Sequence, residues 1–206
     1  MIVIVDYGIG NISSIANMLK KVGAKAIIAS DFDTIRKAQK LILPGVGAFD
    51  AGMKNLQERN LVPILNEMVF ERKIPILGLC LGMQLMAKGS EEGQFEGLGW
   101  IDAKVVRFKF EGESSDLKIP HMGWNTLDLC REHPLVNQLG EDPRFYFVHS
   151  YHLMMNDPND VLAKTQYGYD FASVIQRDNI LGSQFHPEKS HKYGMALLHN
   201  FAEMQP

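Results

Sequence analysis

The chain has 206 residues, of which 46% are hydrophobic and 22% charged, and this composition excludes a disordered chain, a collagen and a coiled coil. The formal net charge of −3 without a basic block argues against a nucleic-acid partner, and no apolar run reaches the length of a membrane span. Two cysteines are too few for a disulfide framework, so we expect free thiols and a cytoplasmic protein.

The first half of the sequence alternates strand and helix patterns. Continuous apolar or β-branched runs predict buried strands at residues 2–5, 25–29, 41–43 and 75–79. Apolar residues at helical spacing predict helices that follow Asn11 as N-cap and Cys80, and two more over residues 49–58 and 62–71. Gly23 is placed to end the first of these helices. Strands that alternate with helices are typical of a parallel sheet covered by helices.

After Gly97 strand patterns dominate. They predict strands at residues 105–110, 126–129, 144–153, 161–165, 172–176 and 180–185, and only the last sixteen residues look helical. We expect these strands to extend the same sheet, with the charged stretch 109–118 as an exposed loop. The expected fold class is α/β, with one domain over residues 1–206. In it a mostly parallel central sheet is flanked by helices and continues in an antiparallel extension.

The segment Gly78-Leu79-Cys80-Leu81-Gly82 carries the clearest chemical signal. A nucleophile framed by glycines, between an apolar strand and a helix, is the nucleophile-elbow pattern with cysteine in place of serine. The glycines are needed because a Cβ at either position would collide with neighbouring backbone. The sulfur would lie at a helix N-terminus, which favours a thiolate, and the Leu81 amide would face an oxyanion. The alternative is a buried core cysteine, which is the role we expect for Cys130.

A cysteine nucleophile needs a base, and His186 is the best placed of the seven histidines. It follows the strand predicted at 180–185, and Glu188 stands where its carboxylate could accept the far ring N–H and fix the tautomer. Parallel strands bring their carboxyl ends to one edge of a sheet, so Cys80 and His186 are expected to meet there. His149 is the next candidate for the base.

Two other glycine-containing segments are candidates for ligand binding. The glycines of Pro44-Gly45-Val46-Gly47, at a strand end, allow backbone amides to approach a ligand, although a plain strand-to-helix turn is the alternative. The Gly8-Ile9-Gly10 loop lacks the third glycine of a dinucleotide site, because Ser13 stands in its place. No cluster of histidine and cysteine has zinc spacing. We therefore expect neither a cofactor nor a metal.

Several segments together give the chain a family resemblance. Residues 78–84 and 184–188 resemble the class I glutamine amidotransferases, with their Cys-His-Glu triad. Residues 6–11, 44–47, 80–85, 120–125 and 146–151 narrow this to the glutaminase subunits of imidazole glycerol phosphate synthases. The resemblance spans essentially the whole chain, in the right order.

This resemblance implies a reaction, a partner and roles for particular residues. Cys80 would attack the side-chain amide of glutamine to give a thioester and ammonia, His186 would move the protons, and Glu188 would orient the imidazole. Amides of Val46 and Leu81 would form the oxyanion hole, and glutamine would be held by Gly47, Gln84, Ser150 and Tyr151. Ammonia would pass to a (β/α)8-barrel synthase subunit of histidine biosynthesis, bound as a heterodimer partner through Asn11, Ser14, Trp124, Tyr146 and Lys189. Core packing is the alternative for Trp124 and Tyr146.

Three other functions remain open at this point. One is a paralogous glutaminase subunit that feeds another acceptor, such as a surface sugar, and a second is a non-catalytic regulatory module on the same scaffold. The intact triad of Cys80, His186 and Glu188 favours an enzyme over such a module. The third, a free-standing hydrolase, is disfavoured by the subunit-specific segments 120–125 and 146–151.

Overall fold

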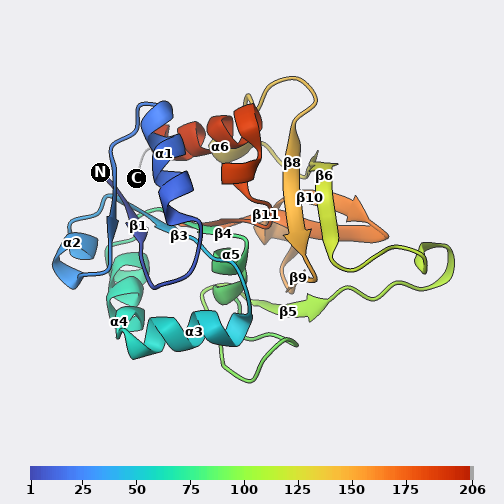
Figure 1. The fold of residues 1–206 in the computed structure, drawn as a ribbon, viewed down its shortest axis with the longest axis horizontal. Helices are drawn as coiled ribbons and strands as arrows, with labels where there is room; N and C mark the ends of the chain where they lie inside the picture. The colour runs from blue at the N-terminus through green and yellow to red at the C-terminus, as the bar shows by residue number, and fades with distance from the viewer. Residues whose placement is uncertain (205–206) are drawn as a thin grey trace.

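The computed structural model describes residues 1–204, in which one mixed β-sheet lies between two layers of helices (Figure 1). Ten strands of the described chain form this sheet, and its parallel part has the order β2-β1-β3-β4-β12. These strands are β1 (Ile2–Val5), β2 (Ala26–Ala29), β3 (Lys40–Leu43), β4 (Ile76–Leu79) and β12 (Ile180–Ser183). All but the edge strand β2 are buried along their whole length, as expected of strands covered on both faces.

The helices cover the two faces of the parallel strands (Figure 1). One layer consists of α1 (Ile12–Lys21) and α6 (His191–Glu203), and the other of α3 (Phe49–Glu58), α4 (Leu61–Asn66) and α5 (Leu81–Leu85). A π-helical turn, Glu67–Glu71, continues α4, so the helix predicted over 62–71 is confirmed as two segments. Gly23 follows α1 with a φ of +82°, which confirms its role at the helix end.

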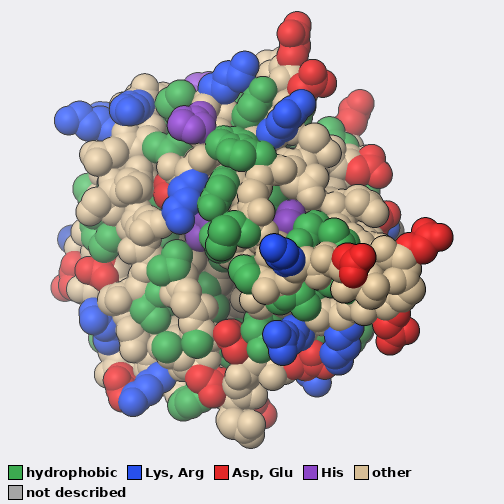
Figure 2. All heavy atoms as spheres, turned by 45° about the vertical axis from the view of Figure 1, so that its right-hand side comes forward, with side chains coloured by type: hydrophobic (Ala, Val, Ile, Leu, Met, Phe, Trp, Pro, Cys, Tyr) green, Lys and Arg blue, Asp and Glu red, His purple; other side chains and the backbone are tan. Residues whose placement is uncertain are grey.

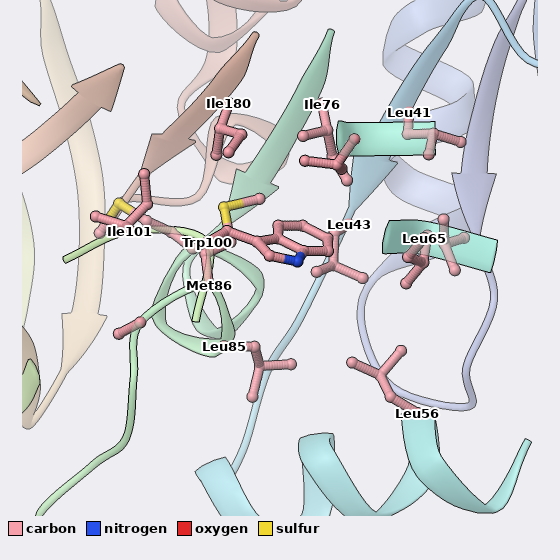
Figure 3. Close-up of a cluster of buried hydrophobic side chains, with 14 of the residues drawn as sticks. Leu41, Leu43, Leu56, Leu65, Ile76, Leu85, Met86, Trp100, Ile101 and Ile180 are labelled. Carbon is pink, nitrogen blue, oxygen red and sulfur yellow. The ribbon is translucent and has the colours of Figure 1, made fainter. Parts of the chain in front are cut away.

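The core between the sheet and the α3–α5 layer is shown in Figure 3. There Leu43 and Ile76 of the sheet face Leu56 and Leu85 of the helices, and the indole of Trp100 lies between them. On the opposite face of the sheet, α1 and α6 contribute the helical side of a second buried cluster. None of the helices in the described chain has the length and apolarity needed to cross a membrane.

The antiparallel extension of the sheet is confirmed, with two corrections to its predicted strands. Residues 126–129 do not form one strand, because Thr126 ends β6 (His121–Thr126) and only Asp128 and Leu129 form β7. Beyond β12 the sheet continues through β11 (Tyr169–Arg177), β10 (Val161–Tyr167), β9 (Tyr151–Met155), β5 (Ala103–Arg107) and β7 (Asp128–Leu129). The strand predicted over 144–153 is wrong as one element, because it bends at Ser150 and its halves join different sheets. Its first half, β8 (Arg144–His149), pairs with β6 (His121–Thr126) in a separate two-stranded ribbon. Burial alternates along β8, as in a ribbon with one face on the core.

Two smaller features complete the comparison with the sequence. The short helix α2 (Phe32–Arg36) was not predicted, since five residues give no helical period; Asp31 caps it by accepting from the Thr34 N–H at 2.8 Å. The charged stretch 109–118 is an exposed loop with one 3-10 turn, Gly112–Ser114, as expected.

Candidate active site

Cys80 lies at the sharp turn between β4 and α5, with the left-handed backbone φ of +51°. Such a conformation costs an L-residue about 1–3 kcal/mol and persists only where its surroundings fix it. Here the Cys80 N–H donates to the Ser183 carbonyl at 2.8 Å, and the Cys80 carbonyl accepts from Met83 and Gln84 at 3.1 and 3.2 Å. The chain therefore forms the elbow that its glycine pattern indicates.

The two glycines of this elbow are required by close backbone approaches. A Cβ on Gly82 would lie 1.8 Å from the carbonyl oxygen of Leu43, and one on Gly78 would lie 2.7 Å from the Met83 nitrogen. Both contacts are with backbone, which cannot swing aside as a side chain would. The helix behind the sulfur has only five residues, so its dipole favours the thiolate less than that of a longer helix would.

The sheet places His186 beside Cys80. Strands β4 and β12 are parallel neighbours with Ser183 opposite Leu79, so the segments after both strands leave the sheet at the same edge. His186 Nδ1 lies 2.9 Å from Glu188 Oε1, and both side chains are only 4% exposed. Because Nδ1 faces the carboxylate, Nε2 is the nitrogen left for the sulfur.

The electrostatics of this group favour a charged imidazole. Burial lowers the pKa of His186, but its hydrogen bonds with Cys80 and Glu188 and the negative charge of both outweigh burial and raise the pKa to about 10. Burial raises the pKa of Glu188, yet the hydrogen bond and charge of His186, with a further bond from Asn11, bring it below its usual range. A cation beside a cysteine sulfur favours the nucleophilic thiolate.

His149, the other base considered, is engaged elsewhere. Its Nδ1 lies 2.8 Å from the Tyr151 carbonyl and its Nε2 lies 3.0 Å from His121 Nδ1. Burial, above all, holds the pKa of His149 well below its usual value, so the ring is neutral. The geometry therefore favours His186 as the base.

A cavity of about 530 Å³ opens over Cys80. The residues predicted to hold glutamine or its oxyanion all line it, namely Val46, Gly47, Leu81, Gln84, Ser150 and Tyr151. Glu92 and Lys189 add one charge of each sign to its wall. A second hollow of about 570 Å³, between β5, β9, β10 and β11, has no cysteine or serine among the described residues that line it, and it does not contain the triad.

The segment 44–47 is held by contacts at Pro44 and Gly45, whereas Gly47 has open space beside it. The Tyr7 hydroxyl donates to the Pro44 carbonyl at 2.5 Å, and a Cβ on Gly45 would lie 2.7 Å from the Gly82 nitrogen. Gly47, by contrast, has a φ of +98° and open space where a Cβ would project. Burial, with the nearby charge of Cys80, holds the pKa of Tyr7 far above its usual range, so its hydroxyl stays a donor.

The residues expected at a partner interface fall into two groups. Asn11 stands at the N-cap position of α1 but makes no cap bond, which corrects the sequence interpretation; its side chain donates to Glu188 Oε1 at 3.0 Å instead. Ser14 is exposed on α1. The other three residues, Trp124, Tyr146 and Lys189, lie together at the surface.

Trp124, Tyr146 and Lys189 form a surface cluster near the cavity. Trp124 is 46% exposed, which rules out the core-packing alternative for it, and its ring stacks on His191 with centroids 5.5 Å apart. Lys189 Nζ lies 5.6 Å from the ring centroid of the half-buried Tyr146. Figure 2, in which the side that carries β6 and β8 comes forward, shows apolar side chains gathered at the centre of this face.

Other residues near the site could not be identified from the sequence. Tyr7, Glu92 and Gln184 reach it from a loop, a turn and a strand end, and only the folded chain brings them together. Cys130 was expected to be structural, but it is exposed and lies outside the cavity. Among residues 1–204 no group of three or more histidine, cysteine or acidic side chains is arranged to hold a metal ion.

Comparison with known proteins places this chain in a family. The model of the family "Glutamine amidotransferase class-I" matches residues 3–204. The chain is 52% identical to "Imidazole glycerol phosphate synthase subunit HisH 2" of Pseudomonas aeruginosa, over 99% of this chain and 100% of the relative. It is 53% identical to the protein of the same name from Methanococcus maripaludis, over 98% of each chain.

Solved structures agree in fold. A structure described as "Crystal structure of glutamine amidotransferase" has a TM-score of 0.73 at 21% identity and covers 98% of this chain and 99% of its own. "Structure of PurLQS from Thermotoga maritima" also has a TM-score of 0.73, at 17% identity, and covers 97% of this chain and 95% of its own. The chain therefore belongs to the class I glutamine amidotransferases, within the group of imidazole glycerol phosphate synthase subunits HisH.

Proposed function

We propose that this chain is the glutaminase subunit of an imidazole glycerol phosphate synthase. It hydrolyses glutamine to glutamate and ammonia and delivers the ammonia to a (β/α)8-barrel synthase subunit in histidine biosynthesis. The observation that carries the proposal is the convergence of Cys80, His186 and Glu188 at one sheet edge, in a chain about half identical to HisH subunits over its full length.

In the first half of the reaction, the thiol proton of Cys80 resides on His186 Nε2, as the raised pKa of that imidazole favours, and the Cys80 sulfur attacks the carbonyl carbon of the glutamine side chain. The oxygen of that carbonyl becomes an oxyanion, for which amides of Leu81 and the Val46 segment are the proposed donors. The imidazolium then returns its proton to the nitrogen, the C–N bond breaks and ammonia leaves. A glutamyl thioester remains on Cys80.

In the second half, His186 accepts a proton from water, and the resulting hydroxide attacks the thioester carbonyl. The C–S bond breaks, glutamate forms, and the sulfur recovers a proton from the imidazolium. Glu188 keeps Nδ1 protonated throughout, so that Nε2 is the nitrogen that exchanges protons in both halves.

The cavity wall supplies groups that complement glutamine as an α-amino acid. Gln84 Nε2 already donates to the Tyr151 carbonyl and to Gln184 at 3.0 and 3.1 Å, so its oxygen is the atom left to accept from a ligand. We assign the substrate ammonium to Gln84 and Glu92, and the α-carboxylate to Lys189 and the backbone near Gly47 and Ser150.

A partner subunit would supply the acceptor that consumes the released ammonia. In water ammonia is mostly ammonium, which is not a nucleophile, so a closed path to the acceptor favours productive transfer. Trp and Tyr are enriched among interface hot spots, and this surface presents the exposed Trp124 and the half-buried Tyr146, which lies beside Lys189. We assign this cluster, with Asn11 and Ser14, to the barrel subunit.

The test compares the chain alone with the chain bound to its barrel partner and the partner's phosphoribosyl acceptor. We expect slow release of glutamate from the free chain and strong stimulation in the complex, because a glycine at position 47, with open space beside it, lowers the cost of reorienting the oxyanion segment when a partner binds. A complex that releases no glutamate would contradict the proposal, and a free chain at full rate would favour a free-standing hydrolase.

The other candidate function is that of a paralogous glutaminase subunit, which supplies ammonia to a different acceptor. The observation that favours it is that the relatives from Pseudomonas aeruginosa and Methanococcus maripaludis both carry the numeral 2 in their names. The discriminating measurement is whether the barrel partner consumes ammonia on the histidine-pathway acceptor or on a sugar.

A further inference from the structure

We propose that Gln184 is a positioning residue for the nucleophile, because its side-chain amide donates a hydrogen bond to the sulfur of Cys80. Gln184 is fully buried directly after β12, and its Nε2 lies 3.7 Å from Cys80 Sγ. It is not among the described residues that line the cavity, so it acts on the sulfur and not on the substrate. The inference rests on the proposed function only in taking Cys80 as the nucleophile.

The orientation of this amide follows from its neighbours. Gln84 Nε2 lies 3.0 Å from the Tyr151 carbonyl, which can only accept, so the Gln84 nitrogen must face it. The same nitrogen lies 3.1 Å from Gln184, which must therefore present its oxygen there. The remaining half of the Gln184 amide is the NH2 group, and it points at the sulfur.

The Tyr151 carbonyl, which orients the Gln84 amide, is itself held by a buried histidine pair. It accepts from His149 Nδ1 at 2.8 Å, and the His149 Nε2 then accepts from His121 Nδ1 at 3.0 Å. His121 Nε2 in turn lies 3.2 Å from Asn125 Nδ2. Burial lowers the pKa of His121 to about 4, so both rings are neutral and each has one donor and one acceptor nitrogen.

The far end of this chain of hydrogen bonds is also fixed by backbone groups. Asn125 donates from Nδ2 to the Gln166 carbonyl at 3.0 Å and accepts at Oδ1 from the Thr126 N–H at 2.9 Å. The network thus runs without a break from β6 to Cys80, and backbone groups set the direction of its donors. An amide held this firmly is preorganised toward the sulfur.

A neutral donor aimed at the sulfur stabilises the thiolate more than the thiol or the thioester. The thiolate is the attacking group in the first half of the reaction and the leaving group in the second. The titratable groups that face this sulfur are His186, with Glu188 behind it, and Tyr7. His186 loses its proton as the pH rises, whereas the Gln184 amide donates at every pH.

The test measures alkylation of Cys80 by iodoacetamide in the full chain, at neutral and at strongly alkaline pH. Gln184→Met keeps the length of the side chain and removes the donor. We expect alkylation about tenfold slower at neutral pH, the effect of one lost hydrogen bond to a charged group. At strongly alkaline pH hydroxide is abundant enough to remove the thiol proton without help from a donor, so the two rates should be equal. Gln57→Met, at an exposed position of α3, is the matched control and should behave as the parent.

Gln184→Glu keeps the shape of the side chain and turns an oxygen toward the sulfur. It should therefore slow alkylation at neutral pH more than Gln184→Met does. It also replaces the methionine variant in this test if that variant does not fold. Equal rates for both variants and the parent at neutral pH would overturn the proposal, and so would a loss of the same size at both pH values, which marks a structural role. In the complex with the barrel partner, kcat for glutamate release should fall about tenfold with KM unchanged. If the parent complex releases no glutamate while the alkylation difference persists, the proposed function fails and the positioning role stands.

Discussion

Glu188→Gln isolates the charge of the triad carboxylate from its geometry. Both donors to this carboxylate, His186 Nδ1 and Asn11 Nδ2, reach the same oxygen, Oε1, at 2.9 and 3.0 Å. The other oxygen, Oε2, is buried and has no hydrogen-bond partner among the described residues. A glutamine can therefore keep its oxygen where both donors need it and place its NH2 group at the unpartnered position.

We expect a moderate loss in the rate of glutamate release. A hydrogen bond to a charged group contributes about 1.5–3 kcal/mol and a neutral one about 0.5–1.5 kcal/mol, so the substitution removes about 1–1.5 kcal/mol of support for the imidazolium. This corresponds to about tenfold in glutamate release by the complex with the barrel partner. His186→Ala should cost at least about a hundredfold, because it removes the group that transfers protons.

The pH profile gives an independent readout. Burial lowers the pKa of His186, and hydrogen bonds and charges of Cys80 and Glu188 raise it to about 10, so removing one of these charges must lower it. The alkaline limb of the kcat profile should then move to lower pH in Glu188→Gln, whereas Glu141→Gln, at an exposed acid, should leave it in place. A rate as low as that of His186→Ala, or an unchanged rate and profile, would refute this account of the carboxylate.

Three further outcomes are expected. Cys80→Ser should abolish glutamate release while Cys130→Ser keeps it, since only the first lines the cavity; loss of activity in the Cys130 variant alone would sink the assignment. Lys40→Met should lower the free energy of unfolding by about 1–3 kcal/mol in urea, because the buried ammonium donates to the Phe201 and Ala202 carbonyls at the end of α6; an unchanged midpoint would contradict this. Burial lowers the pKa of His121 to about 4, so the unfolded chain binds the proton more readily, and stability should fall as the pH drops from 6.5 toward 4. His121→Asn should make that fall shallower in urea titrations, and an identical slope would count against a neutral buried ring.

Much of the parallel half of the fold could be predicted from local sequence. Buried parallel strands read as continuous apolar runs, so β1, β3 and β4 were predicted to within about one residue. The elbow at Cys80 was equally predictable, since only glycine fits where Gly78 meets the Met83 nitrogen five positions along the chain. In both cases the constraint acts within a few residues of the chain or within one periodic element.

The rest depends on contacts between distant segments. The bend at Ser150 leaves no periodic signal, because residues 144–155 have strand character throughout, and only pairing with β6 or β5 separates the two strands. Asparagine is a favoured N-cap residue, but the side chain of Asn11 donates to the distant Glu188 instead of capping α1. Tyr7 and Gln184 act across 37 and 104 positions, on Pro44 and Cys80, which is why no spacing rule could reveal them.

The proposed function depends most directly on hydrolysis of glutamine through a glutamyl thioester on Cys80. The complex of this chain with its barrel partner should be quenched in acid during glutamine turnover, and the peptides of the chain then mapped by mass spectrometry. We predict a glutamyl group on the peptide that contains Cys80, more abundant in Glu188→Gln if that substitution slows deacylation, and absent from Cys80→Ser. Ammonia release with no glutamyl group on Cys80, or with the group on another residue, would contradict the account.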